Sequence, residues 1–149
     1  MKMKSEKSCR ICNVLYHYVI RNIPIFGVSV STMIHEYGHL ISSKLLGFHG
    51  YIKSGRLTAV YYDSFPIGRQ WSLFYISGGA FQFIFFFLMS FRGEDKNVNI
   101  SNRMTGIIGI IEALSEPLKY FRLSGLGSSI GIITSMIYMA YIVVTSKAD

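Results

Sequence analysis

The chain has 149 residues, of which 50% are hydrophobic and 15% are charged, against about 25% charged residues in soluble domains. These values, with a mean hydropathy of +0.36, exclude a disordered chain, a coiled coil and a collagen-like repeat. The formal net charge of +7 favours loops that face a negative membrane surface over a nucleic-acid interface. We therefore expect a small multi-pass integral membrane protein without a nucleic-acid partner.

Within the N-terminal residues 1–22, four basic side chains lie in the first ten: Lys2, Lys4, Lys7 and Arg10. A secretory signal peptide needs an unbroken apolar stretch and a small-residue cleavage site. Here His17 interrupts the apolar stretch and Arg21 follows it without such a site. We expect this segment to be a basic cytoplasmic tail with a short interfacial segment, which places the N-terminus in the cytoplasm.

Crossing a bilayer as a helix takes roughly 20 apolar residues. The candidate spans are 24–46, 70–91, 104–121 and 124–146. The second and fourth contain no charged residue, whereas the first and third carry His or Glu at membrane depth. Residues 50–65 are rich in Tyr, Val, Ile and Thr, which indicates a hairpin. The predicted fold is an all-α membrane protein of about four transmembrane helices, with a small β-hairpin after the first, in a single membrane-embedded domain over 23–146.

The first span contains the sequence HEYGH, an H-E-x-x-H pattern that begins at His35 and ends at His39. Residues i and i+4 share one face of a helix, so both histidines can reach one zinc ion. Glu36 lies about 100° around the helix, where it can act on water as a general base and then as a general acid in peptide hydrolysis. The alternative is a solvated helix face, but the motif closes an apolar run in which unpartnered ionisable groups are costly.

The stretch HEYGHLISSKLLGFHG resembles the HExGHxxxxxxxG signature of the site-2 protease-like intramembrane zinc metallopeptidases. The resemblance extends over the following hairpin to SGGAFQ, the Gly-rich start of the next span. It implies a zinc helix inside the membrane that ends at a glycine before a short sheet. It also implies one Zn²⁺ per chain and a membrane protein or peptide as substrate. Gln82 in SGGAFQ could bind substrate or an oxyanion, or make an inter-helix hydrogen bond, and both remain open.

The third zinc ligand of that family, an Asp in a Leu-Asp-Gly segment, has no counterpart here, because Asp63, Asp95 and Asp149 fall in predicted loops or in the tail. Glu112 and Glu116 are a substitute, since they share one face of the third span and two histidines with one Glu are an established zinc ligand set. We expect Glu112 to ligate, because it lies deeper in the apolar run, with Glu116 second and Asp63 third. Alternatively, one glutamate ligates and the other orients a histidine.

The expected function is that of a membrane-embedded, zinc-dependent endopeptidase, with His35, His39 and Glu112 as metal ligands and Glu36 as the catalytic residue. An exposed strand edge of the hairpin could hold an unwound substrate by β-augmentation. Two alternatives stay open: a catalytically silent membrane scaffold or binding protein with a degenerate metal site, and a zinc hydrolase of a lipid-linked substrate. A homo-oligomer or a partner subunit is also compatible with so short a chain.

Overall fold

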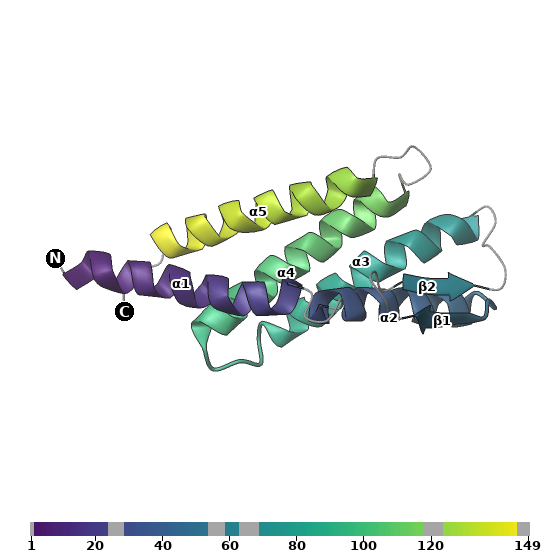
Figure 1. Ribbon diagram of the computed structural model, residues 1–149, viewed down its shortest axis with the longest axis horizontal. Coiled ribbons are helices and arrows are strands. Elements are labelled where there is room, and N and C mark those ends of the chain that lie inside the picture. The colour runs from purple at the N-terminus through teal and green to yellow at the C-terminus, as the bar shows by residue number, and fades with distance from the viewer. Residues whose placement is uncertain (1, 24–28, 54–58, 63–68, 118–123, 146–149) are drawn as a thin grey trace.

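A computed structural model describes residues 2–23, 29–53, 59–62, 69–117 and 124–145. Within these residues the protein consists of five helices and one two-stranded sheet (Figure 1). The elements, in chain order, are α1 (Lys2–Asn22), α2 (Val30–Leu45), β1 (Gly50–Lys53), β2 (Ala59–Tyr62), α3 (Arg69–Met89), α4 (Lys96–Ser115) and α5 (Ser124–Thr145). The expected all-α class is confirmed.

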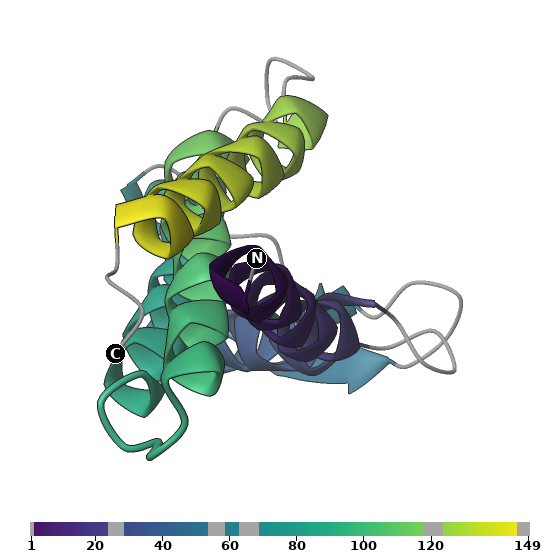
Figure 2. The same cartoon turned by 90° about the vertical axis from the view of Figure 1, so that its left-hand side faces the viewer.

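Helix α4 is the centre of the bundle, because it packs against α1, α3 and α5, while α2 packs against α3. Helices α1 and α2 follow one another along one side of the bundle, as the two views in Figures 1 and 2 agree. The sheet lies beside α2, at the opposite end of the molecule from the α3–α4 connection (Figure 1). This arrangement brings the C-terminal end of α4 close to the middle of α2 and α3.

The ends of α2 are set by local sequence. The Ser29 hydroxyl accepts a hydrogen bond from the Thr32 backbone N–H at 3.0 Å and caps the first turn. The helix ends at Leu45, and Gly47, two residues later, has a φ of +82° that suits glycine. Strands β1 and β2 follow and pair antiparallel, in a register that sets Gly50 opposite Tyr62 and Lys53 opposite Ala59.

The N-terminal residues, expected to be a basic tail with a short interfacial segment, form one continuous helix from Lys2 to Asn22. The predicted start of the third span differs from the start of its helix. Helix α4 begins at Lys96, capped by the Asp95 carboxylate, eight residues before the predicted start at 104. Its first turns contain Asn and Ser side chains that are buried between helices and resemble a loop in sequence. Residues 24–28, 118–121 and 146 of the expected spans lie outside the described residues, as do 54–58 and 63–65 of the expected hairpin.

One apolar cluster joins α1, α4 and α5. It consists of Val14, Tyr18, Ile100, Met104, Ile108 and Met139. Where α4 meets α3, in contrast, small residues let the two backbones touch: a Cβ added to Gly79 would overlap the Gly109 carbonyl oxygen and the Ala113 backbone nitrogen. The bundle therefore packs through large side chains on one side of α4 and through glycines on the other.

The outer surface of every helix is rich in large apolar side chains. Examples on successive helices are Tyr16, Leu45, Leu88, Leu114 and Val144, which are 59–83% exposed. Among the described residues, one helical segment, Gln70–Met89, is long and apolar enough to cross a membrane, by length and composition. The expectation of four spans goes beyond that finding.

Candidate metal centre

The centre of the candidate site is the pair of histidines on α2. His35 and His39 are one turn apart on the buried face of the helix and are 7% and 5% exposed. Their Nε2 atoms lie 3.1 Å apart. The i, i+4 spacing on a regular helix produces this convergence, as the sequence motif predicted.

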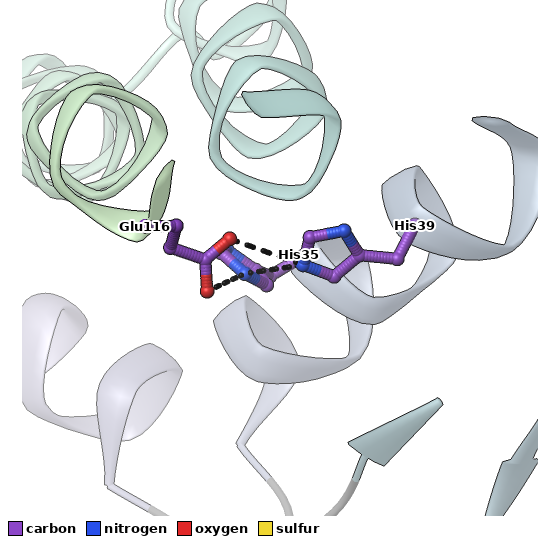
Figure 3. A group of neighbouring side chains, drawn as sticks. All are labelled: His35, His39 and Glu116. Carbon is purple, nitrogen blue, oxygen red and sulfur yellow. Dashed lines mark hydrogen bonds and ion pairs between the residues drawn. The ribbon is translucent and has the colours of Figure 1, made fainter. Parts of the chain in front are cut away.

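A carboxylate from α4 completes the group. Glu116, the C-cap residue of α4, places Oε1 3.3 Å from His35 Nε2 and Oε2 3.2 Å from His39 Nε2. Figure 3 shows the two imidazoles and this carboxylate pointing toward one another. All three residues are buried, and together they could hold a metal ion.

The two Nδ1 atoms face away from this group and meet oxygen acceptors. His39 Nδ1 lies 2.9 Å from the Phe74 carbonyl oxygen, and His35 Nδ1 lies 3.4 Å from Glu112 Oε2. A carbonyl oxygen can only accept, so a neutral His39 carries its hydrogen on Nδ1. The carboxylate 3.4 Å from His35 Nδ1 favours the same tautomer there by its charge, without a formed hydrogen bond. Both Nε2 lone pairs then face each other and the Glu116 carboxylate. These electron-rich groups repel one another unless a cation or protons lie between them.

Helix α3 leaves room for this group by means of one glycine. A Cβ added to Gly78 would lie 2.7 Å from His35 Nε2 and would also overlap His39 Nε2. The opposing position on α2 is Gly38, where an added Cβ would lie 2.5 Å from the Ser77 carbonyl oxygen. Because neither residue has a side chain, α3 passes directly in front of the two histidines.

A network of hydroxyl groups surrounds the Phe74 carbonyl that holds His39. The Ser77 hydroxyl donates to that carbonyl at 2.6 Å and lies 2.7 Å from the Ser42 hydroxyl on α2. The His39 and Phe74 rings also stack, with centroids 4.7 Å apart. The orientation of His39 is thus fixed by α3 as well as by its own helix.

The structure groups Glu116, the second choice from sequence, with both histidines, and places Glu112 behind His35 instead. Glu36 is half-buried on α2, next to His35. Gln82 is buried on α3, and its Nε2 donates to the Thr105 carbonyl oxygen of α4 at 3.2 Å. Asp63, the third candidate ligand, lies outside the described residues.

Sequence reasoning missed two contributors to the site, the Phe74 carbonyl and Gly78. A backbone carbonyl leaves no trace in the sequence of a helix. The signal for Gly78 was present in the pair Gly78-Gly79 within an otherwise bulky segment, since adjacent small residues in a membrane helix indicate close approach of neighbours.

Comparisons of the chain with protein-family models, with curated proteins and with solved structures found no match. The resemblance to the site-2 protease-like peptidases therefore rests on the HEYGH motif and the residues that follow it.

Proposed function

We propose that the protein is a membrane-embedded, zinc-dependent endopeptidase that hydrolyses peptide bonds within or beside the bilayer. The observation that carries the proposal is the convergence of two Nε2 atoms and one carboxylate, with Glu36 adjacent on the same helix. This is the donor set and the acid–base residue that metal-assisted peptide hydrolysis requires.

The spacing of the donor atoms supports zinc. Zn–N bonds of about 2.0–2.1 Å put neighbouring ligand atoms of a tetrahedron about 3.3 Å apart. Two separations that share one carboxylate oxygen come close to this value: His39 Nε2 lies 3.1 Å from His35 Nε2 and 3.2 Å from Glu116 Oε2. The 3.3 Å contact of His35 Nε2 is with the other oxygen, Oε1. The acceptor at His39 Nδ1 is a further support, because histidines that bind zinc through one nitrogen almost always donate from the other.

The distribution of side chains supports a membrane environment. Buried polar residues include Ser43, Gln82, Ser101, Thr105 and Ser135, all at most 2% exposed, while large apolar residues cover the outside. Small and polar residues at helix contacts, with apolar residues outward, are typical of helices packed in lipid. We propose that four segments cross the bilayer, namely residues 24–46, which include α2, and the helices α3, α4 and α5, with the N-terminus cytoplasmic.

In the proposed reaction, His35, His39 and Glu116 would hold zinc, which would supply a Lewis acid for the attacking water and the scissile carbonyl. Glu36 accepts one proton from the attacking water while the water oxygen bonds to the carbonyl carbon. When the C–N bond breaks, Glu36 returns that proton to the departing amine. The carboxylate thus ends the cycle ionised, and one water is consumed for each peptide bond cleaved.

Substrate could be held at the sheet. A transmembrane helix hides its carbonyls in backbone hydrogen bonds, so it must unwind before cleavage. The two-stranded sheet lies against α2, the helix that carries the histidines, and a strand pair leaves outer edges to which an extended peptide can add. The proposed substrate is therefore a membrane protein segment in extended form.

The test compares wild-type protein with Glu36→Gln in detergent or vesicles, using a transmembrane peptide as substrate. We expect both to bind about one zinc per chain, while cleavage by Glu36→Gln falls about 10²–10⁴-fold, the usual contribution of a general base. Glu94→Gln, the same change at an exposed position, is the matched control and should cleave normally. Wild-type protein that takes up no zinc, or that holds zinc and leaves the peptide intact, would refute the proposal. The first result favours the silent scaffold, and the second directs the search to lipid-linked substrates.

A further inference from the structure

His35, on α2, lies between two carboxylates that both belong to α4. Glu116 Oε1 lies 3.3 Å from its Nε2, and Glu112 Oε2 lies 3.4 Å from its Nδ1. The two glutamates are four residues apart, so they lie one turn apart on one face of α4 and reach opposite edges of the same ring. Their side chains are 20% and 11% exposed for Glu112 and Glu116, respectively.

The two carboxylates cannot exchange roles in this geometry. Glu116 faces the Nε2 atoms of both histidines, so a cation shared by those nitrogens is also within its reach. The carboxylate of Glu112 approaches the Nδ1 edge of His35, and the nitrogens of an imidazole point to different sides of the ring. A cation bound at Nε2 is therefore shielded from Glu112 by the ring itself.

We propose that Glu112 is a positioning residue that accepts the Nδ1 hydrogen of His35 and so keeps the Nε2 lone pair directed into the metal centre. The inference deepens the proposed function and rests on it for the identity of the metal. A negative charge behind the ring also makes the imidazole a stronger electron-pair donor. His39 is supported differently, by the Phe74 backbone carbonyl.

The difference between the two supports makes the idea testable, because the support of His35 belongs to a side chain and can be removed by mutation. Glu112→Gln retains an oxygen acceptor and the length of the side chain, but removes the charge. Glu112→Ala removes the acceptor as well. If Glu112 positions His35, the losses must be graded, with Gln intermediate between the native residue and Ala.

The experiment measures zinc affinity of the full-length, detergent-purified protein by competition with a chromophoric chelator. Outer partners of metal-bound histidines typically contribute 10–100-fold in affinity. We expect Glu112→Gln to weaken zinc binding about tenfold and Glu112→Ala up to about 100-fold, both still with one zinc per chain at saturation. Glu94→Gln is the matched control for the loss of one exposed carboxylate and should bind as wild type does.

A second measurement identifies the atoms that bind metal. Cobalt(II) loaded in place of zinc has visible absorption bands that report the ligand set and its geometry. We expect Glu112→Gln to retain the wild-type spectrum and Glu116→Gln to change or lose it. A residue with a merely structural role would lower the melting temperature of the metal-free protein, whereas the two Glu112 variants should melt as the wild-type protein does.

Three results would overturn the inference: wild-type zinc affinity in Glu112→Ala, a changed cobalt spectrum in Glu112→Gln with an unchanged one in Glu116→Gln, or lowered metal-free stability that accounts for the affinity loss. The proposed function fails separately. A wild-type protein that binds zinc with the graded Glu112 effects but cleaves no transmembrane peptide refutes the peptidase and retains the positioning role. A wild-type protein that binds no zinc refutes both.

Discussion

The two halves of α4 meet their neighbours in different ways. The N-terminal half, counted here as far as Ile108, buries Ile100, Met104 and Ile108 among large side chains of α1 and α5. The C-terminal half meets α3 through Gly109, and a Cβ added to Gly79 of α3 would collide with it. Beyond this contact, Glu112 and Glu116 lie against the histidines of α2. One half of the helix packs as a core does, and the other half packs backbone against backbone to place carboxylates.

This difference separates stability from chemistry along one helix. Large side chains fill space but hold neighbouring helices further apart, whereas glycines allow an approach close enough for Glu116 to reach two histidines on α2. Polar groups strengthen the first half without entering the site: Arg21 donates to the Ser101 hydroxyl at 2.8 Å, and Asn22 to the Thr105 hydroxyl at 3.1 Å. Substitutions in the two halves should therefore have separable effects on unfolding and on zinc.

Among variants that keep all three metal ligands, Gly78→Ala is expected to lower the zinc content of the protein most. The new methyl group would overlap His39 Nε2 and lie 2.7 Å from His35 Nε2, so both rings must turn away from Glu116. Zinc content should fall from about one per chain to near zero, as measured by elemental analysis. Gly106→Ala is the control, because its Cβ would come no closer than 3.5 Å to any neighbour. Normal zinc content in Gly78→Ala would contradict the location of the site.

The core half is probed by Met104→Ala. Met104 is fully buried. Truncation of such a side chain typically lowers the free energy of unfolding by about 2–5 kcal/mol, because transfer energy is lost and a cavity is left behind. We expect a loss of that size in the free energy of unfolding in detergent, with the zinc affinity of the folded protein unchanged. Leu114→Ala, at a 71% exposed position of the same helix, should unfold as wild type does. Equal losses in both variants would mean that the apolar cluster is not the stabilising core.

The glycine contact is probed by Gly79→Ala. Its methyl group would collide with backbone atoms of Gly109 and Ala113, which cannot rotate away as a side chain can. We expect a loss of about 1–3 kcal/mol in unfolding free energy, as for overpacked cores, and weaker zinc binding because α4 carries Glu116 away from α2. Gly106→Ala should instead be neutral or gain up to about 1 kcal/mol from helix propensity. A Gly79→Ala protein with wild-type zinc affinity would show that the close approach does not position Glu116.

Prediction from sequence succeeded where local geometry determines the answer. The i, i+4 spacing of His35 and His39 fixes their common face in any helix, and the same spacing put two glutamates on one face of α4. The spacing could not decide which glutamate faces both histidines, because that depends on the rotation of α4 and on where it ends relative to α2. Depth in the apolar run favoured Glu112, but the glycine contact between α3 and α4 sets the level at which α4 meets α2.

The start of α4 was hidden for a related reason. Ser101, Asn102 and Thr105 are buried, and in sequence such residues indicate a loop. Their partners lie on other helices, as in the hydrogen bonds from Arg21 and Asn22. A polar segment that forms helix only because a neighbouring helix satisfies its side chains cannot be recognised from its own composition. The apolar stretches 70–91 and 124–146, which need no such partner, lie close to the bounds of α3 and α5.

The smallest expected effect belongs to Gln82→Met. Gln82 is the one buried side-chain amide on α3, and it lies against the middle of α4. Its Nε2 donates to the Thr105 carbonyl, so the substitution, similar in length but unable to donate, should cost about 0.5–1.5 kcal/mol in unfolding free energy. Zinc affinity and the rate of peptide cleavage per zinc-loaded molecule should stay at wild-type values, because the amide is already used between helices. If Gln82 instead contacts the substrate as an oxyanion donor, cleavage would fall about 10²–10³-fold while stability hardly changed. The ratio of the two effects thus assigns Gln82 either to the packing of α3 on α4 or to the reaction.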